Sequence, residues 1–232
     1  FNIISPDNKI KIVVFDLDGT LWRGAAADHD DVGPHLTEGW PLSILEAAAF
    51  LKMRGILLAI ASKNDADTAR RIWTALYEKK FPLSNFVSSQ FSWGSKADSI
   101  ATILRETNLL PENCLFVDDN PLEREQVKMA FPGIQLISGP VSTWRRTLLW
   151  GAELQMPYIT RESAGRTQSI QAVIQREAIR QEVDEEEYFR SLAVSVTVER
   201  IAATDDKKFA RALELLNKTN QFNTTGKRWT EN

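Results

Sequence analysis

The chain has 232 residues, of which 43% are hydrophobic and 25% are charged. This balance argues against wholesale disorder, and the length suits one large domain or one domain with a smaller companion. A formal net charge of -3 offers nucleic acid little attraction. One cysteine and two histidines exclude a disulfide framework and argue against a thiolate or multi-histidine metal site, so any bound metal should be a hard ion held by oxygen.

No stretch of the sequence approaches the roughly 20 apolar residues that a membrane helix needs. The N-terminus also lacks the basic and apolar pattern of a secretory leader. The chain starts at Phe1 rather than Met, so we expect a processed or cloned piece. The expected location is the cytoplasm, with neither a membrane nor a nucleic-acid partner.

Short apolar runs alternate with helical patterns from residue 9 to about residue 136. The runs that predict buried strands are 11–15, 56–61, 85–88, 114–117 and 134–136. The patterns that predict helices are 41–54, 65–77, 96–107 and 122–130. This alternation is typical of βαβ units, and it predicts a three-layer, Rossmann-like α/β fold with a mainly parallel sheet. Such folds bind ligands beyond the carboxyl ends of their strands.

The character of the chain changes after residue 150. Residues 160–190 are polar and charged with a thin apolar stripe, which predicts a helical connection. A strand is expected over 193–198, and Thr204 is expected to cap a helix that carries Phe209. Because residues 191–232 are too few to bury much core, we expect them to be either the start of a second domain cut short or an appendage packed on the first domain. The expected organisation is a catalytic domain over 1–150, a helical linker over 151–190 and the tail over 191–232.

The strongest chemical pattern is Asp-Leu-Asp-Gly-Thr at 16–20, directly after the first expected strand. Asp16 and Asp18 can reach the same crevice if the chain turns there, and Gly19 permits the turn. One carboxylate can attack a phosphoryl group while the other moves a proton. Two neighbouring anions also predict a cation between them. Taken alone, the pattern is more often a solvated Asp-Gly turn.

Three further polar segments are expected near the same edge of the sheet. Asp118 and Asp119 follow the fourth expected strand and would add two carboxylates. Ser62 and Asn64 follow the second strand and precede a helix N-terminus, which suits a phosphate. Lys96 opens a helix, where a positive charge is mildly unfavourable against the helix dipole. The ordinary alternatives are helix caps for the acidic pair and for Asn64, and a surface position for the lysine.

Together and in this order, the four segments resemble the motifs of the haloacid dehalogenase-like phosphohydrolase superfamily over residues 9–136. The resemblance implies a nucleophile at Asp16, which forms an aspartyl-phosphate, and an acid/base at Asp18. It also implies that Ser62 bonds the transferring phosphoryl group and that Lys96 balances its charge.

The same resemblance implies Mg2+ as cofactor, which would neutralise charge in the transition state. Its ligands would be Asp16, the backbone carbonyl of Asp18, and Asp119, with Asp118 as close support or with the roles of the last two reversed. Substrate contacts are expected from Thr20 in the first motif, from Asn64 in the second, and from Arg23, which follows the first motif.

Four stretches narrow the resemblance to the FkbH-like subgroup, namely 16–22, 55–64, 118–127 and 216–223. In that subgroup a phosphatase-like domain is commonly followed by an acetyltransferase-like domain, which implies that the tail begins such a domain. Members of the subgroup are associated with moving phosphoglyceryl groups onto carrier proteins. The resemblance therefore implies an acyl carrier protein as a possible partner.

One departure from the subgroup bears on the reaction. Members that carry a glyceryl thioester are expected to have a cysteine just before Ser62, where this chain has Ala61. The single thiol, Cys114, is expected in a buried strand. The sequence therefore favours hydrolysis of a phosphorylated small molecule or carrier-bound substrate over glyceryl transfer. A catalytically idle module that docks a carrier is a third alternative, against which the intact Asp16 and Asp18 argue.

The spacing of the motifs predicts an open, capless site. The segment between Asp16 and the helix expected at 41 is too short for a lid domain, and one helix and one strand fill the space between Ser62 and Lys96. An open site suits a large substrate or a partner that completes it. The loop at 24–38 could select the leaving group, although a solvated loop is the ordinary alternative. Its polar residues are Asp28, His29, Asp30 and Asp31, and the preceding Trp22 is expected in the core.

Overall fold

The computed structural model describes residues 10–26, 32–37, 40, 43–156, 159, 165–182, 195, 197–201 and 203–218. The chain divides into two compact units, residues 1–182 and residues 183–232. Among the described residues, no helix has the length and apolar character required to cross a membrane.

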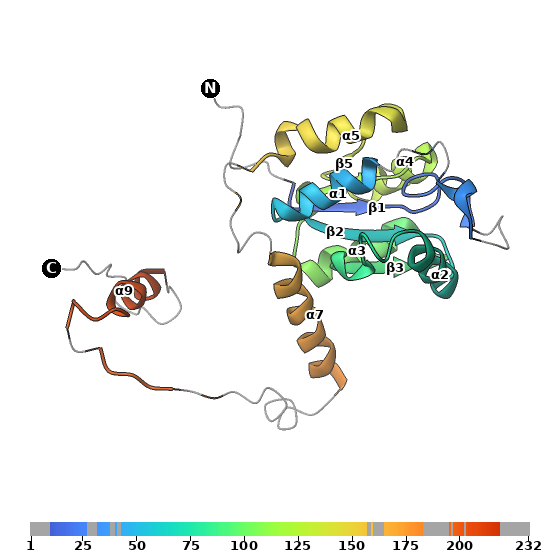
Figure 1. Cartoon of the computed structure of the whole chain (residues 1–232). Helices are drawn as coiled ribbons and strands as arrows, with labels where there is room; N and C mark the ends of the chain where they lie inside the picture. The colour runs from blue at the N-terminus through green and yellow to red at the C-terminus, as the bar shows by residue number, and fades with distance from the viewer. Residues whose placement is uncertain are drawn as a thin grey trace. The chain divides into compact units, whose positions relative to one another are not determined.

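A parallel sheet of five strands forms the centre of the first unit (Figure 1). Its order is β3-β2-β1-β4-β5, and all four strand pairs run parallel. The strands are β1 (Ile12–Phe15), β2 (Leu57–Ser62), β3 (Ser88–Phe91), β4 (Cys114–Val117) and β5 (Gln135–Leu136). The predicted Rossmann-like α/β fold is confirmed.

Helices cover both faces of this sheet, because alternate residues of the buried strands point to opposite sides. Val13 and Phe15 face a core that includes residues of α1, α2 and α5, whereas Ile12 and Val14 face a core with residues of α3 and α4. The bounds of these helices are α1 (Ser43–Met53), α2 (Ala66–Leu76), α3 (Lys96–Thr107), α4 (Pro121–Ala130) and α5 (Val141–Trp150).

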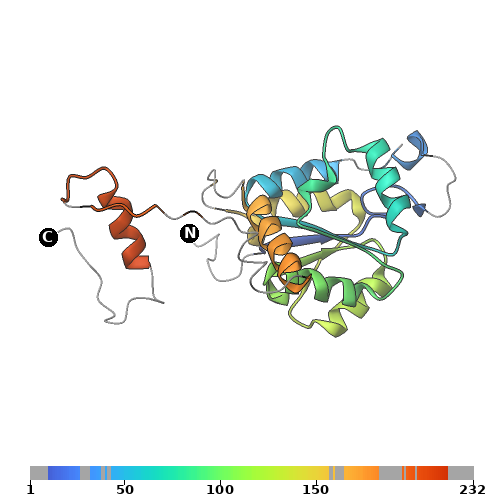
Figure 2. The ribbon, with the colours of Figure 1, turned by 90° about the horizontal axis from the view of Figure 1, so that it is seen from below.

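The first unit also contains α7 (Arg166–Glu182), which packs against its sheet domain. Ile170 and Ile174 lie against the core that includes residues of α3 and α4. Arg166 Nη1 donates a hydrogen bond to the carbonyl of Gly55 at 3.0 Å. Figure 2 shows α7 in orange against this unit, seen from below. The segment expected as a linker thus contains a helix anchored to the sheet domain by apolar packing and hydrogen bonds.

Three sequence expectations differ from the structure at their boundaries. The strand expected over 85–88 lies at 88–91, because residues 83–85 form a single 3-10 turn. The helix expected to start near Thr204 is α9 (Phe209–Lys218) in the second unit. Of the strand expected over 193–198, the described residues 195, 197 and 198 are in no strand.

Candidate active site

The sheet register brings the predicted motifs to one edge of the first unit. Phe15, the last residue of β1, pairs with Ile60 on β2 and with Val117 on β4. Asp16 and Asp118 directly follow two of these paired strands, so they leave the sheet side by side. Ser62 ends β2, and Lys96 opens α3 after the Ser95 N-cap. Parallel pairing therefore gathers segments that are far apart in sequence.

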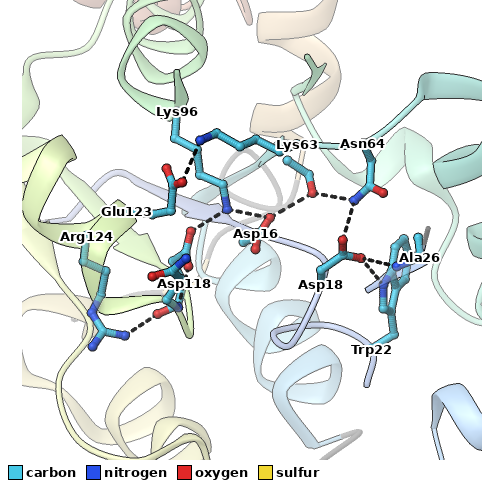
Figure 3. Close-up of polar contacts among 12 residues, drawn as sticks. Asp16, Asp18, Trp22, Ala26, Lys63, Asn64, Lys96, Asp118, Glu123 and Arg124 are labelled. Carbon is cyan, nitrogen blue, oxygen red and sulfur yellow. Dashed lines mark hydrogen bonds and ion pairs between the residues drawn. The ribbon is translucent and has the colours of Figure 1, made fainter. Parts of the chain in front are cut away.

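Lys96 joins two carboxylates in the centre of the site (Figure 3). Its Nζ lies 2.8 Å from Asp16 Oδ1 and 2.5 Å from Asp118 Oδ2. All three side chains are buried, with 5%, 7% and 0% of the side chains of Lys96, Asp16 and Asp118 exposed. A buried cation between two carboxylates offsets charge that would otherwise be unpaired in the protein interior. Lys96 is therefore part of the site rather than a surface lysine.

A chain of hydrogen bonds extends from Asp16 to Asp18 on the other side. Ser62 Oγ donates to Asp16 Oδ1 at 2.8 Å. The Asn64 side-chain amide donates to Ser62 Oγ at 3.0 Å and to Asp18 Oδ2 at 3.1 Å. Asn64 is thus a member of the site, and the N-cap of α2 is Asp65, which accepts from the backbone of Thr68.

Asp18 is also held by a residue that the sequence placed in the core. The indole Nε1 of Trp22 donates to Asp18 Oδ1 at 2.6 Å, and the backbone N–H of Ala26 donates to the same oxygen at 3.1 Å. Trp22 is fully buried, so the core expectation is correct for its ring. The hydrogen bond was missed because hydrophobic patterning says nothing about where an indole N–H points. An Asp four residues before a Trp in a tight turn is the only local signal.

Three carboxylates are placed to hold a cation. One carboxylate oxygen from each of Asp16, Asp118 and Asp119 lies within 4.8 Å of the others. Oxygen ligands of this kind suit a hard ion such as Mg2+. Both oxygens of Asp118 already accept hydrogen bonds, from Lys96 and from the backbone N–H of Asn120 at 2.8 Å. Asp119 is exposed and lines the adjoining hollow.

Burial and charge act on the proton affinity of these groups. Burial raises the pKa of Asp16 to about 7, with Lys96 opposing the shift and Asp118 adding to it. The pKa of Asp119 is also raised, by partial burial and by the charge of Asp118. Burial lowers the pKa of Lys96, but Asp16 and Asp118 outweigh it and leave the pKa raised. Lys96 is thus a cation, whereas a metal-free Asp16 binds its proton more tightly than an ordinary aspartate does.

A hollow of about 630 Å³ opens beside Asp16 and Asp18. The catalytic candidates Asp16, Asp18, Ser62 and Lys96 line it. The sequence analysis did not single out Trp40, Lys63 or Glu123, which also line it. Lys63 and Glu123 form an ion pair at 2.6 Å, and Trp40 Nε1 donates to the carbonyl of Thr20 at 3.0 Å. No sequence pattern pairs these residues, because 60 positions separate Lys63 from Glu123.

All three expected substrate contacts lie outside the lining of this hollow. Asn64 reaches it only through its hydrogen bonds to Asp18 and Ser62, which do line it. Thr20 is fully buried, and its Oγ1 has no hydrogen-bond partner among the described residues. Arg23 is exposed, and its backbone N–H donates to the carbonyl of Leu36. The loop candidates Asp28, His29, Asp30 and Asp31 lie outside the described residues.

The single thiol lies away from the hollow. Cys114 is the first residue of β4 and is fully buried, at the strand end opposite to Asp118. Burial raises the pKa of the Cys114 thiol far above its usual range. Ala61, the position where a thioester-carrying relative would have cysteine, is buried in β2.

Comparison with known proteins gave matches among solved structures. No family model matches the chain, and no curated protein matches it. The chain is similar to the N-terminal part, containing a phosphatase domain, of a Bacteroides fragilis protein complexed with Mg. The identity is 27% and the TM-score is 0.53, over 62% of this chain and 41% of that chain. The chain thus covers less than half of that structure, and this likeness agrees with the α/β fold of the first unit.

Two more distant matches are phosphatases of deoxy-octulosonate 8-phosphates. The cobalt-bound enzyme from Haemophilus influenzae is 15% identical with a TM-score of 0.42, over 79% of this chain and 98% of that chain. The Moraxella catarrhalis enzyme, in complex with a magnesium ion, a phosphate ion and a KDO molecule, is 16% identical with a TM-score of 0.38, over 80% of this chain and 93% of that chain.

Proposed function

We propose that the first unit is a Mg2+-dependent phosphohydrolase that works through an aspartyl-phosphate at Asp16. The observation that carries the proposal is the setting of the Asp16 carboxylate. It accepts hydrogen bonds from Lys96 and Ser62, and it lies beside Asp118 and Asp119 at an open hollow. The similar Bacteroides structure, which contains a phosphatase domain and Mg, supports the same chemistry.

The reaction proceeds in two displacements. In the first, a carboxylate oxygen of Asp16 attacks phosphorus, the bond from phosphorus to the leaving oxygen breaks, and Asp18 gives its proton to that oxygen. In the second, Asp18 takes a proton from water as the water oxygen attacks phosphorus. The bond from phosphorus to Asp16 then breaks, which releases inorganic phosphate and restores the Asp16 carboxylate, with the proton from water now on Asp18.

The remaining residues of the site orient the phosphoryl group and balance its negative charge. Lys96 and Ser62, which already bond Asp16, are assigned to the transferring phosphoryl oxygens. Asp16, Asp119 and the backbone carbonyl of Asp18 are assigned as Mg2+ ligands, with Asp118 in support, because Asp118 is already bonded through both oxygens. When bound, Mg2+ supplies charge neutralisation at the phosphoryl group.

We propose a phosphorylated small molecule or carrier-bound group as the substrate, with Asn64 close to it and with Thr20 and Arg23 shaping the surrounding loop. We also propose cytoplasmic activity, with 1–150 as the catalytic domain and the tail as the start of an acetyltransferase-like domain of FkbH-like type. Glyceryl transfer to an acyl carrier protein is the weaker candidate, because the buried Cys114 offers no thiol at the hollow.

Hydrolysis of p-nitrophenyl phosphate by the purified chain tests the proposal. Phosphate release should require Mg2+, should stop with EDTA, and should be lost in Asp16→Asn. A matched control is Asp65→Asn, because Asp65 caps α2 outside the hollow and asparagine also caps helices well. Activity that survives Asp16→Asn, or equal loss in both variants, would contradict the mechanism.

A further inference from the structure

Trp22 packs in the core and also donates a hydrogen bond to a carboxylate of the site, that of Asp18. Its ring is fully buried, yet its indole N–H lies 2.6 Å from the carboxylate of Asp18. The indole groups of Trp40, Trp73 and Trp144 donate instead to backbone carbonyls, at 2.9 to 3.0 Å. A hydrogen bond to an ionised acceptor is shorter and stronger than one to a neutral acceptor. The contact of Trp22 is therefore of a different kind.

The two carboxylate oxygens of Asp18 accept different numbers of hydrogen bonds (Figure 3). Oδ1 accepts from the indole N–H of Trp22 and from the backbone N–H of Ala26. Oδ2 accepts a single hydrogen bond, from Asn64. A carboxylate oxygen has two lone pairs, so the two donors occupy Oδ1, whereas Oδ2 keeps one position free. The proton that Asp18 transfers therefore belongs on Oδ2.

Backbone contacts hold Trp22 and Asp18 in one rigid turn. The backbone N–H of Trp22 donates to the carbonyl of Leu17 at 3.2 Å, and Trp22 also pairs with Asp18 in an isolated bridge. The N–H of Gly19 donates to the carbonyl of Gly24 at 3.2 Å, which closes the same loop. With its ring packed in the core, Trp22 fixes both the position and the rotation of the Asp18 side chain.

We infer that Trp22 is a positioning residue for the acid/base Asp18. It binds Oδ1 so that Oδ2 is directed to the leaving oxygen in the first displacement and to water in the second. The inference rests on the proposed phosphohydrolase function. No atom is transferred to or from the indole: the proton passes between Asp18 Oδ2 and the reacting oxygen, and the Trp22 N–H stays bound to Oδ1.

The test is Trp22→Phe, which keeps an aromatic ring in the core and removes the N–H. A poor leaving group, such as an alkyl alkoxide, needs the proton of Asp18, whereas p-nitrophenolate leaves without one. With Mg2+ present, kcat/KM for alkyl phosphates should fall about tenfold or more beyond any fall for p-nitrophenyl phosphate. Because kcat/KM reports the steps up to the first bond cleavage, slow hydrolysis of the intermediate does not mask this difference.

Trp144→Phe is the matched control, because Trp144 is also buried and its indole N–H donates to the carbonyl of Gly139, neither residue lining the hollow. It should lower thermal stability by a comparable amount and leave the ratio of the two kcat/KM values unchanged. An equal fall for both substrate classes in Trp22→Phe would overturn the positioning role. Absence of wild-type hydrolysis would instead overturn the proposed function.

A second measurement does not depend on the folding of Trp22→Phe. In a proton–nitrogen NMR spectrum of the wild-type chain, one of the seven indole resonances should lie well downfield, because its proton is shared with a carboxylate. Asp18→Asn should move that resonance upfield more than the other six. If all seven resonances shift equally little, the inference is wrong.

Discussion

Gly19 and Asp119 lie so close together that no side chain fits between them. A Cβ on Gly19 would lie 2.3 Å from Asp119 Oδ2. Gly19 also has a φ of +65°, in the region that favours glycine. The glycine therefore serves two purposes: it allows the turn that brings Asp18 into the site, and it leaves space for a carboxylate from another strand end.

Gly19→Ala should therefore impair the metal site as well as the turn. The new Cβ must displace Asp119, so Mg2+ affinity should fall. The positive φ should in addition cost about 1–2 kcal/mol of unfolding free energy. Calorimetric Mg2+ titration and thermal unfolding measure the two effects. Gly133→Ala is the control, because its Cβ would meet its nearest neighbour at an ordinary 3.5 Å. Unchanged Mg2+ affinity in Gly19→Ala would contradict this account.

Asp118 and Asp119 should respond differently to loss of charge. Asp119→Asn should weaken Mg2+ binding with little effect on the stability of the metal-free chain, because Asp119 is exposed. Asp118→Asn should destabilise the metal-free chain by about 1–3 kcal/mol, since it removes the charged acceptor that Lys96 bonds at 2.5 Å. Urea unfolding with and without Mg2+ separates the two roles. The reverse pattern would assign Asp118 as the direct ligand.

Lys96→Met should lower the unfolding free energy far more than Lys63→Met does. Removing Lys96 leaves two buried carboxylates unpaired, which costs about 3–5 kcal/mol in other buried pairs. Lys63 is 37% exposed in its ion pair with Glu123, so its loss should cost less than about 1 kcal/mol. Added Mg2+ should restore part of the stability of Lys96→Met. Similar unfolding free energies for the two variants would show that Lys96 is better hydrated than its burial indicates.

Mg2+ binding should strengthen as the pH rises through neutrality. Burial raises the pKa of Asp16 to about 7 in the metal-free chain, from an ordinary value of 3.8. Between these values the folded chain holds a proton that the unfolded chain has released, so the contribution of Asp16 to stability falls as the pH rises. A metal must displace this proton, so its affinity should fall about tenfold per pH unit below the pKa of Asp16.

Thermal unfolding with Mg2+ or with EDTA, at pH 6 and at pH 8, measures this effect. The rise in Tm on adding Mg2+ should be larger at pH 8. Asp16→Asn is the control, because asparagine holds no titrating proton and its response to Mg2+ should depend much less on pH. A wild-type rise that is the same at both pH values would mean that Asp16 is ionised without metal.

The Cys114 thiol should be inert in the folded chain. Complete burial in β4 raises its pKa and blocks access, so a disulfide reagent at pH 8 should react slowly with native protein and completely in denaturant. Because the chain has one cysteine, the signal needs no assignment. The native rate should rise with denaturant in step with unfolding. Rapid labelling of the native chain would contradict this prediction and show that the Cys114 thiol is reactive.

The sequence alone determined the alternation of β1 to β5 with α1 to α4 and the segments that carry the chemistry, but it did not predict α5. Apolar runs and helical periodicity are local, so they predicted β4 and α3 with their observed bounds. The rule that ligands bind beyond parallel strand ends placed Asp16 and Asp118 at one edge. The sequence placed the third strand three residues early, because nothing in 85–88 distinguishes a 3-10 turn from the start of a strand.

Only the tertiary structure decided which polar groups bond each other. Lys96 lies between Asp16 and Asp118, Asn64 bonds Asp18 rather than capping α2, and the buried Trp22 donates to Asp18. These contacts depend on side-chain rotamers and on segments joined only by strand register. A hydrogen bond is sensitive to a few tenths of an ångström and to angle, whereas hydrophobic patterning fixes only which face of an element is buried. The sequence could thus predict the carboxylates, Ser62, Asn64 and Lys96 of the site, but neither the other residues that line it nor the hydrogen bonds among them.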